Sequence, residues 1–132
     1  MSTIQIRGQA SLKGEIEVQG SKNAVLPIMA AAMIHKGSTV LENVPRIQDV
    51  FCMMDIMEQL GCQVKLEGNT LHICANTLKS TEIPEEYVKR MRSSIMVLGA
   101  LLGREKEAVT YYPGGCSIGK RPIDLHLAVL RQ

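Results

Sequence analysis

The residues best suited to chemistry gather in a glycine-rich segment, residues 114–122. Cys116 lies among glycines at positions 114, 115 and 119, and Lys120 and Arg121 follow it closely. Nearby positive charge lowers a thiol pKa from its usual value of about 8.5 and so favours the nucleophilic thiolate. Glycines favour a loop, where functional residues concentrate. We expect a loop that performs catalysis or contacts a ligand; the alternative is a surface loop with an incidental cysteine.

Two other cations stand at the expected starts of helices, where an anionic ligand would be attracted. Lys22 follows Gly20 and Ser21 at a helix N-terminus, whose free amides and positive dipole end favour anions. Arg92 opens the equivalent helix of a second, similar unit, and a guanidinium can bind phosphate or carboxylate through two hydrogen bonds. A solvated surface charge is the ordinary alternative for each. Because the two positions match, we expect them to face a shared crevice.

Several other chemistries fit the sequence poorly. The segment with Cys116 lacks the magnesium ligand of a nucleotide-binding P-loop, because Arg121 stands where that motif requires Ser or Thr. Asp124 and His126 point to different sides of an expected helix, which argues against a Cys-His-Asp triad. Asp124 is expected to cap that helix or to accept a hydrogen bond from a sugar or a base. The cysteines and histidines lack zinc-ligand spacing, so we expect no metal and no cofactor.

Bulk composition is that of an ordinary globular protein. A net charge of +2 over 132 residues, with one Phe, three Tyr and no Trp, argues against nucleic-acid binding. The N-terminus has no apolar signal segment, and the longest apolar run, residues 24–34, contains Pro27 and is too short to span a bilayer. We therefore expect a soluble, cytoplasmic protein. Cys52, Cys62 and Cys74 occupy apolar-periodic positions and are expected to be reduced and buried.

Hydrophobic periodicity and turn residues predict alternating strands and helices. Strands are expected over residues 4–7, 12–18, 38–42, 62–66, 70–74 and 108–112, the fourth and fifth forming a hairpin at Gly68-Asn69. Helices are expected over residues 21–35 with Ser21 as N-cap, from Asp49 as N-cap to residue 60, over residues 84–102, and from residue 122 or 123 onward.

This order of elements repeats within the chain. Helix, strand, proline-containing loop and helix run from residue 21 to residue 61, and again from about residue 89 to the end. The sequence therefore predicts an α/β (α+β) fold built as an array of similar units. It also predicts that the chain ends inside its second unit, as a piece of a longer protein.

Three segments resemble the signatures of one family, UDP-N-acetylglucosamine 1-carboxyvinyltransferase. They read GSKNAVLP at 20–27, VKRMRSS at 88–94 and PGGCSIGKRPIDLH at 113–126, and their order and spacing fit along the whole chain. The resemblance implies transfer of the enolpyruvyl group from phosphoenolpyruvate to the 3-hydroxyl of UDP-N-acetylglucosamine, with release of phosphate. That reaction is the first committed step of peptidoglycan precursor synthesis.

The resemblance also implies a role for each matching residue. Cys116 would donate a proton to the methylene carbon of phosphoenolpyruvate and would be alkylated by fosfomycin. Phosphoenolpyruvate would be bound by Lys22, Asn23 and Arg121. The UDP-sugar would be contacted by Asn23, Arg92, Arg121, Pro122, Ile123, Asp124 and Leu125.

The fold implied by the resemblance is an inside-out α/β barrel of repeated βαβαββ units in two domains, with the active site between the domains. Residues 1–20 would then be strands that belong with the second domain. Residues 21–132 would form part of the catalytic domain, about one and a half units. Its partners would be the two substrates and the remaining C-terminal part of the same protein; self-association of the piece is an open alternative.

Three other interpretations stay open. The sister enzyme that acts on shikimate 3-phosphate shares the implied fold, but Asn23 and Cys116 argue against it. A second alternative is a non-catalytic module that binds a UDP-sugar or another anion. A third is a redox sensor that uses Cys116.

Overall fold

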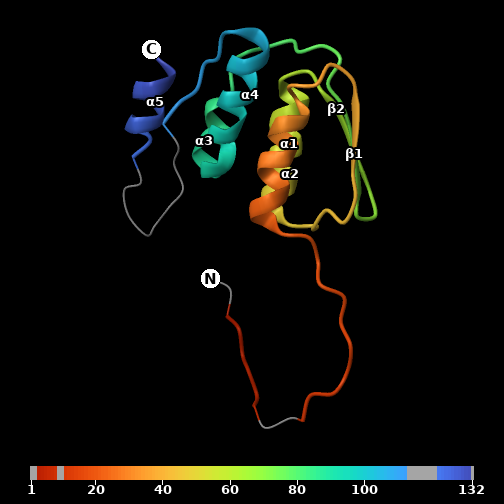
Figure 1. Ribbon diagram of the computed structural model, residues 1–132. Helices are drawn as coiled ribbons and strands as arrows, with labels where there is room; N and C mark the ends of the chain where they lie inside the picture. Colours follow the sequence, from red (N-terminus) through yellow and green to blue (C-terminus); the bar gives the residue numbers. More distant parts are fainter. Residues whose placement is uncertain (1–2, 9–10, 113–121, 132) are drawn as a thin grey trace.

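The computed structural model of the protein describes residues 3–8, 11–112 and 122–131. In chain order its elements are α1 (Lys22–Ala32), β1 (Ser38–Leu41), α2 (Gln48–Gln59), β2 (Gln63–Glu67), β3 (Thr70–Cys74), α3 (Glu85–Arg90), the 3-10 turn η1 (Arg92–Ser94), α4 (Ile95–Glu105) and α5 (Asp124–Leu130). Figure 1 shows α1 and α2 between the sheet and the pair formed by α3 and α4. The observed architecture is the mixed α/β arrangement that the sequence predicts.

The three strands form one antiparallel sheet in the order β1-β3-β2. Gly68 takes a φ of +58° at the turn between β2 and β3, a left-handed conformation that suits glycine. This is the predicted hairpin. Leu71 and Ile73 of β3 are buried against the helices, whereas His72 between them faces solvent. The alternation of apolar and polar residues thus decides which face of the sheet is covered.

Apolar stripes on the helices meet in one core. Its fully buried side chains are Leu26, Met29 and Met33 from α1 and the residue after it; Met53, Ile56, Met57 and Leu60 from α2 and its C-cap; Leu71 and Ile73 from β3; Ile83 from the segment before α3; and Leu101 from α4. α1 packs against both α2 and α4, so it is the central helix of the fold. Pro27 is the sixth residue of α1, so the helix lacks one backbone hydrogen bond, the one that an N–H at this position would donate to the carbonyl of Asn23.

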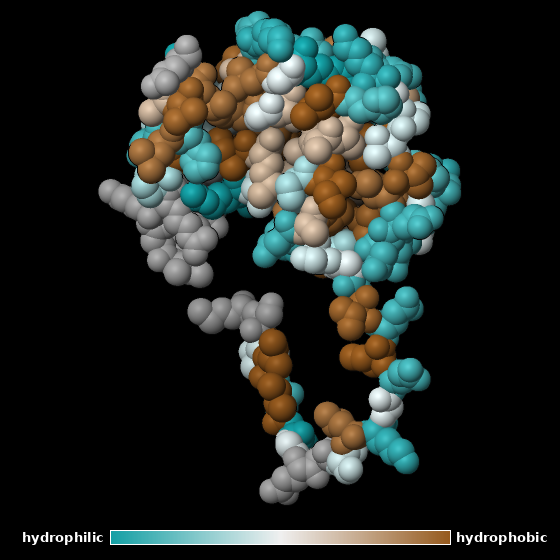
Figure 2. Space-filling model, viewed as in Figure 1, coloured by the Kyte–Doolittle hydropathy of each residue, from teal (hydrophilic) through white to brown (hydrophobic). Residues whose placement is uncertain are grey.

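The strands expected at the N-terminus do not form. Residues 3–8 and 11–20 are extended but unpaired, and they reach away from the body of the protein (Figure 1). Their apolar side chains, Ile4, Ile6, Leu12, Ile16 and Val18, are 80–94% exposed. Figure 2 shows these apolar groups along the extended segment. The prediction fails because a strand needs a neighbour that pairs its backbone and covers its apolar face, and the described residues supply none.

The helix expected over residues 84–102 is broken. Met91 has an extended backbone, with φ −134° and ψ 113°, so the segment divides into α3, η1 and α4. The break allows Val88 of α3, Met91 itself and Val97 of α4 all to bury in the same core. α4 then continues to Glu105, beyond the predicted end, and stops where Lys106 adopts a left-handed conformation.

The strand expected over residues 108–112 is reduced to a single parallel bridge between Val109 and Glu82. Val109 accepts a hydrogen bond from the N–H of Ile83 at 2.9 Å and donates one to the carbonyl of Thr81 at 2.9 Å. The ladder cannot extend because Pro84 is the N-cap of α3 and the backbone becomes helical at Glu85. The bridge still joins the segment before α3 to the segment after α4.

Across the part of the chain that is described, no helix combines the length and apolar character that crossing a membrane requires.

Candidate functional site

The start of α1 is fixed in place by a close backbone approach. A Cβ added at Gly20 would lie 2.0 Å from the carbonyl oxygen of Asn43 and 3.3 Å from Cδ of Pro45. The Asn43 segment is itself held, because Val44 is buried and donates its N–H to the carbonyl of Asn69 at 2.8 Å. Only glycine at position 20 lets the chain enter α1 against this loop, which also leads into α2.

Gly20→Ala is therefore expected to lower the free energy of unfolding by about 1–3 kcal/mol, the usual cost of forcing an extra methyl into an occupied space. The matched control is Gly99→Ala, because Gly99 is an exposed interior residue of α4 with open space around its missing Cβ. That variant is expected to gain about 0.5–1 kcal/mol from helix propensity. Urea denaturation measures both; equal stability of Gly20→Ala and the wild type would contradict the close approach.

Lys22 is the first residue of α1, and its ammonium group is paired. Its Nζ lies 2.7 Å from Oδ2 of Asp49, with the two side chains 53% and 33% exposed. The sequence predicts Asp49 as the N-cap of α2, but the N-cap is Ile47 and Asp49 lies inside the first turn. An isoleucine can hold this position because the cap is made by its extended backbone, without a side-chain hydrogen bond. The carboxylate of Asp49 is thereby directed to Lys22, a contact that sequence reasoning missed.

Ser21 and Asn23 flank this lysine. Ser21 is the N-cap residue of α1, as predicted, although its hydroxyl makes no cap hydrogen bond. α1 ends at Ala32, earlier than the predicted residue 35. Asn23 is exposed beside Lys22 on the first turn. The N-terminal turn of α1 therefore presents an ammonium group, an amide and free backbone N–H groups to solvent, a set that suits an anion.

Arg92 lies in η1, the turn that precedes α4, and its side chain is partly buried and engaged in an interaction. α4 packs against α1. The helix that Arg92 introduces is therefore a neighbour of the helix that Lys22 begins. The shared crevice between the two helix starts stays a prediction.

Pro122, Ile123, Asp124 and Leu125 lie at the start of α5. Ile123 is the N-cap of this helix and is buried, whereas Pro122 and Leu125 are exposed. Asp124 is in the first turn and accepts a hydrogen bond from the hydroxyl of Tyr112 at 3.4 Å. All four residues are predicted to contact the UDP-sugar. The side chain of Ile123, however, is buried and packs inside the protein. Cys116 and Arg121 lie outside the described residues.

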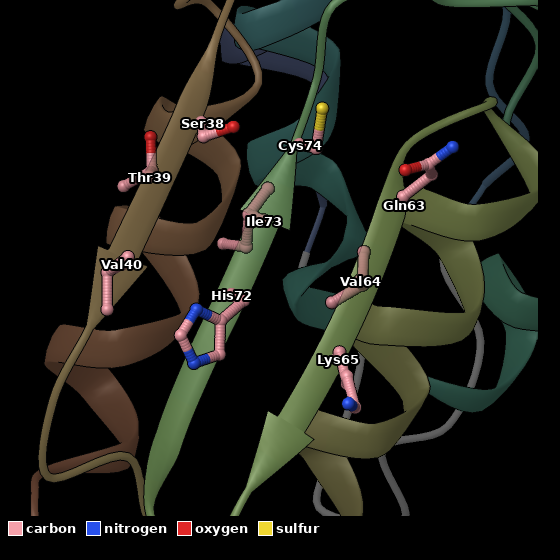
Figure 3. Close-up of a pocket in the computed structure, with 9 residues that line it drawn as sticks. All are labelled: Ser38, Thr39, Val40, Gln63, Val64, Lys65, His72, Ile73 and Cys74. Atoms are coloured by element: carbon pink, nitrogen blue, oxygen red, sulfur yellow. The ribbon is translucent and has the colours of Figure 1, made fainter.

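Two of the hollows on the described surface lie away from the start of α1. One, of about 450 Å³, lies between α4 and α5 and is lined mainly by apolar side chains, including Leu98, Leu102, Tyr111 and Leu127. The other, of about 360 Å³, lies over the outer face of the sheet, where Figure 3 shows His72 on β3 and Lys65 on β2. Lys22, Asn23 and Arg92 line neither hollow.

The thiols within the described residues differ from the setting expected for Cys116. Burial raises the pKa of Cys62 to about 11, and burial also raises the pKa of Cys52 above its ordinary value. Both remain protonated near neutral pH, so the prediction of buried, free thiols is confirmed for these two. Cys74 is only half-buried, because it lies two residues after His72 on β3 and so shares the outer face of the sheet. No group of three or more possible metal ligands occurs among the described residues.

Comparison with known proteins gives consistent matches. A family model described as EPSP synthase (3-phosphoshikimate 1-carboxyvinyltransferase) matches residues 6–132. UDP-N-acetylglucosamine 1-carboxyvinyltransferase of Thermotoga maritima is 48% identical over 132 residues, which are 100% of this chain and 31% of that protein. The enzyme named UDP-N-acetylglucosamine 1-carboxyvinyltransferase 2 of Caldanaerobacter subterraneus is 46% identical over 132 residues, 100% of this chain and 32% of that protein.

A Helicobacter pylori protein of the same name is 43% identical over 133 residues, again covering 100% of this chain and 32% of the relative. The chain thus spans about a third of the length of the curated relatives it matches. Among solved structures, the enolpyruvyl transferase NikO from Streptomyces tendae matches with a TM-score of 0.65 and 26% identity, over 69% of this chain and 21% of that chain.

Proposed function

Because the chain belongs to the EPSP synthase family of carboxyvinyltransferases, we propose that the protein transfers the enolpyruvyl group of phosphoenolpyruvate to the 3-hydroxyl of UDP-N-acetylglucosamine and releases phosphate. The proposal includes a cytoplasmic role in peptidoglycan precursor synthesis. The observation that carries it is the name shared by relatives 43–48% identical over the whole chain. The family model is named for the sister reaction, which is the second candidate.

The start of α1 supports binding of an anionic substrate. Phosphoenolpyruvate carries a phosphate and a carboxylate, and an exposed ammonium group at a helix N-terminus attracts both. Lys22 and Asn23 have that position and exposure. We assign phosphoenolpyruvate to Lys22, Asn23 and Arg121, and the UDP-sugar to Asn23, Arg92 and residues 121–125.

The chemical step requires an acid. In the proposed reaction a proton is delivered to the methylene carbon of phosphoenolpyruvate, which makes the adjacent carbon electrophilic toward the sugar hydroxyl. The sugar oxygen bonds to that carbon and gives up its hydroxyl proton. Loss of phosphate from the same carbon and of a proton from the new methyl group then restores the double bond. We assign the proton delivery to Cys116, and the same thiol is the proposed site of alkylation by fosfomycin.

The proposal extends to the organisation of the chain. Residues 21–132 would form part of the catalytic domain, and residues 1–20 would pack as strands on another part of the whole protein. The exposed apolar side chains along residues 4–18 support this, because they suit a strand that is covered on one face.

The test is a phosphate-release assay on the protein encoded by the complete reading frame. Phosphoenolpyruvate is supplied with UDP-N-acetylglucosamine in one reaction and with shikimate 3-phosphate in another. We expect phosphate release with the UDP-sugar alone. Release with shikimate 3-phosphate would assign the sister reaction, and calorimetric binding of the UDP-sugar without release would assign a binding module.

A further inference from the structure

Two helix starts meet beside the proposed phosphoenolpyruvate site. Lys22 is the first residue of α1, and Asp49 is the second residue of α2. The close approach of Gly20 to Asn43 fixes the one helix start against the loop that leads into the other. The 2.7 Å contact between the ammonium and the carboxylate therefore joins two elements whose relative position is already set.

The side chains of Asp49 and Lys22 differ in conformational freedom. Asp49 has a short side chain, and its negative charge is favoured in the first turn of α2 by the helix dipole. Lys22 has a long, flexible stem and is about half exposed, so without a partner its ammonium group would occupy many positions. An ion pair this exposed adds little to folding stability. Its main consequence is to restrict where the ammonium lies.

We propose that Asp49 is a positioning residue: it holds the ammonium of Lys22 where the lysine stabilises the charge of phosphoenolpyruvate during transfer. The inference rests on the proposed function. It predicts a particular kinetic pattern, because removing a carboxylate beside an anion site does not weaken attraction of the substrate. The variant instead loses kcat, because the transfer step needs the ammonium of Lys22 in one place.

Asp49→Asn, which keeps the shape and removes the charge, is expected to lower kcat about tenfold while leaving KM for phosphoenolpyruvate no higher than in the wild type. Asp49→Glu restores a carboxylate within reach of the flexible lysine and is expected to keep kcat within about threefold of the wild type. Both are measured by phosphate release in the full-length protein with UDP-N-acetylglucosamine.

The matched control is Glu85→Gln. Glu85 is also a first-turn carboxylate, on α3, and it pairs with an exposed lysine, Lys89, at 2.8 Å. This variant removes the same kind of charge and the same kind of ion pair away from Lys22, so its kcat is expected to stay within about twofold of the wild type. Melting temperatures of the two neutral variants are expected to fall by similar small amounts.

The outcomes separate the two proposals. A wild-type protein that releases no phosphate disproves the proposed function and this inference with it. If the wild type is active, a kcat for Asp49→Asn within threefold of it overturns the positioning role alone. An equal loss in Glu85→Gln, or a loss that Asp49→Glu does not relieve, would likewise overturn it, because the effect would then not depend on a carboxylate beside Lys22.

Discussion

Cys116→Ser is expected to abolish nearly all turnover in the full-length protein while leaving UDP-N-acetylglucosamine bound. A serine hydroxyl is a far weaker acid than a thiol, and loss of a positioned general acid lowers rates by about 10²–10⁴-fold. The substitution changes one atom in a segment whose glycines and cations remain. Phosphate release measures kcat, and calorimetry measures the affinity for the UDP-sugar.

The control for this change is Cys74→Ser. Cys74 is a half-buried free thiol at the end of β3, on the outer face of the sheet, so the same replacement should leave turnover unchanged. Intact-mass spectrometry after incubation with fosfomycin provides a second readout: an adduct is expected in the wild type and in Cys74→Ser and is expected to be lost in Cys116→Ser. Undiminished phosphate release by Cys116→Ser would refute the catalytic assignment.

Arg104→Ala is expected to cause a large loss of stability. The side chain of Arg104 is only 3% exposed. It donates to the backbone carbonyls of Met33, Ala75 and Asn76, and to the carboxylate of Glu105. One guanidinium thus joins α4 to the residue that follows α1 and to the chain leaving β3.

Truncation would leave partly buried carbonyl groups without donors and the C-terminal end of α1 without a favourable cation. We expect the free energy of unfolding to fall by about 3–5 kcal/mol, a large share of the 5–15 kcal/mol typical of a domain. Arg104→Lys keeps the charge but cannot reach all three carbonyls, so an intermediate loss is expected.

Arg46→Ala is the matched control for the arginine series. Arg46 also donates to a backbone carbonyl, that of Gly68 at 2.9 Å, and lies over the ring of Phe51, but it is exposed. Its loss is expected to cost about 0.5–1 kcal/mol. Equal unfolding midpoints in urea for Arg104→Ala and Arg46→Ala would show that burial of the Arg104 network contributes nothing.

The sequence predicts well those helices and turns that are determined by residues close together in the chain. Apolar residues at helical spacing specify α1 and α2, and Gly68 marks the turn of the hairpin. The break at Met91 has no such cause, because no glycine or proline lies near it. Its reason is the shared burial of side chains on α3 and α4, which only the assembled core reveals.

The N-terminal strands and the candidate site show the same limit. Alternating residues such as Ile16 and Val18 describe a strand that needs covering, but the pattern does not say what covers it. Lys22, Asn23 and Arg92 could be singled out because charge and helix position suffice to suggest an anion site. Asp49 could not, because its pairing with Lys22 depends on how two helix starts are brought together by a glycine and a loop.

The network of Arg104 also has a consequence for the order of folding. The helices α1 and α2 and the hairpin of β2 and β3 form from contacts that are close in sequence, whereas the bond from Arg104 to Met33 spans 71 residues. Long loops must close before such contacts stabilise the chain, so this bond belongs to the late part of folding. We therefore expect loss of the Arg104 guanidinium to raise the rate constant of unfolding more than it lowers the rate constant of folding.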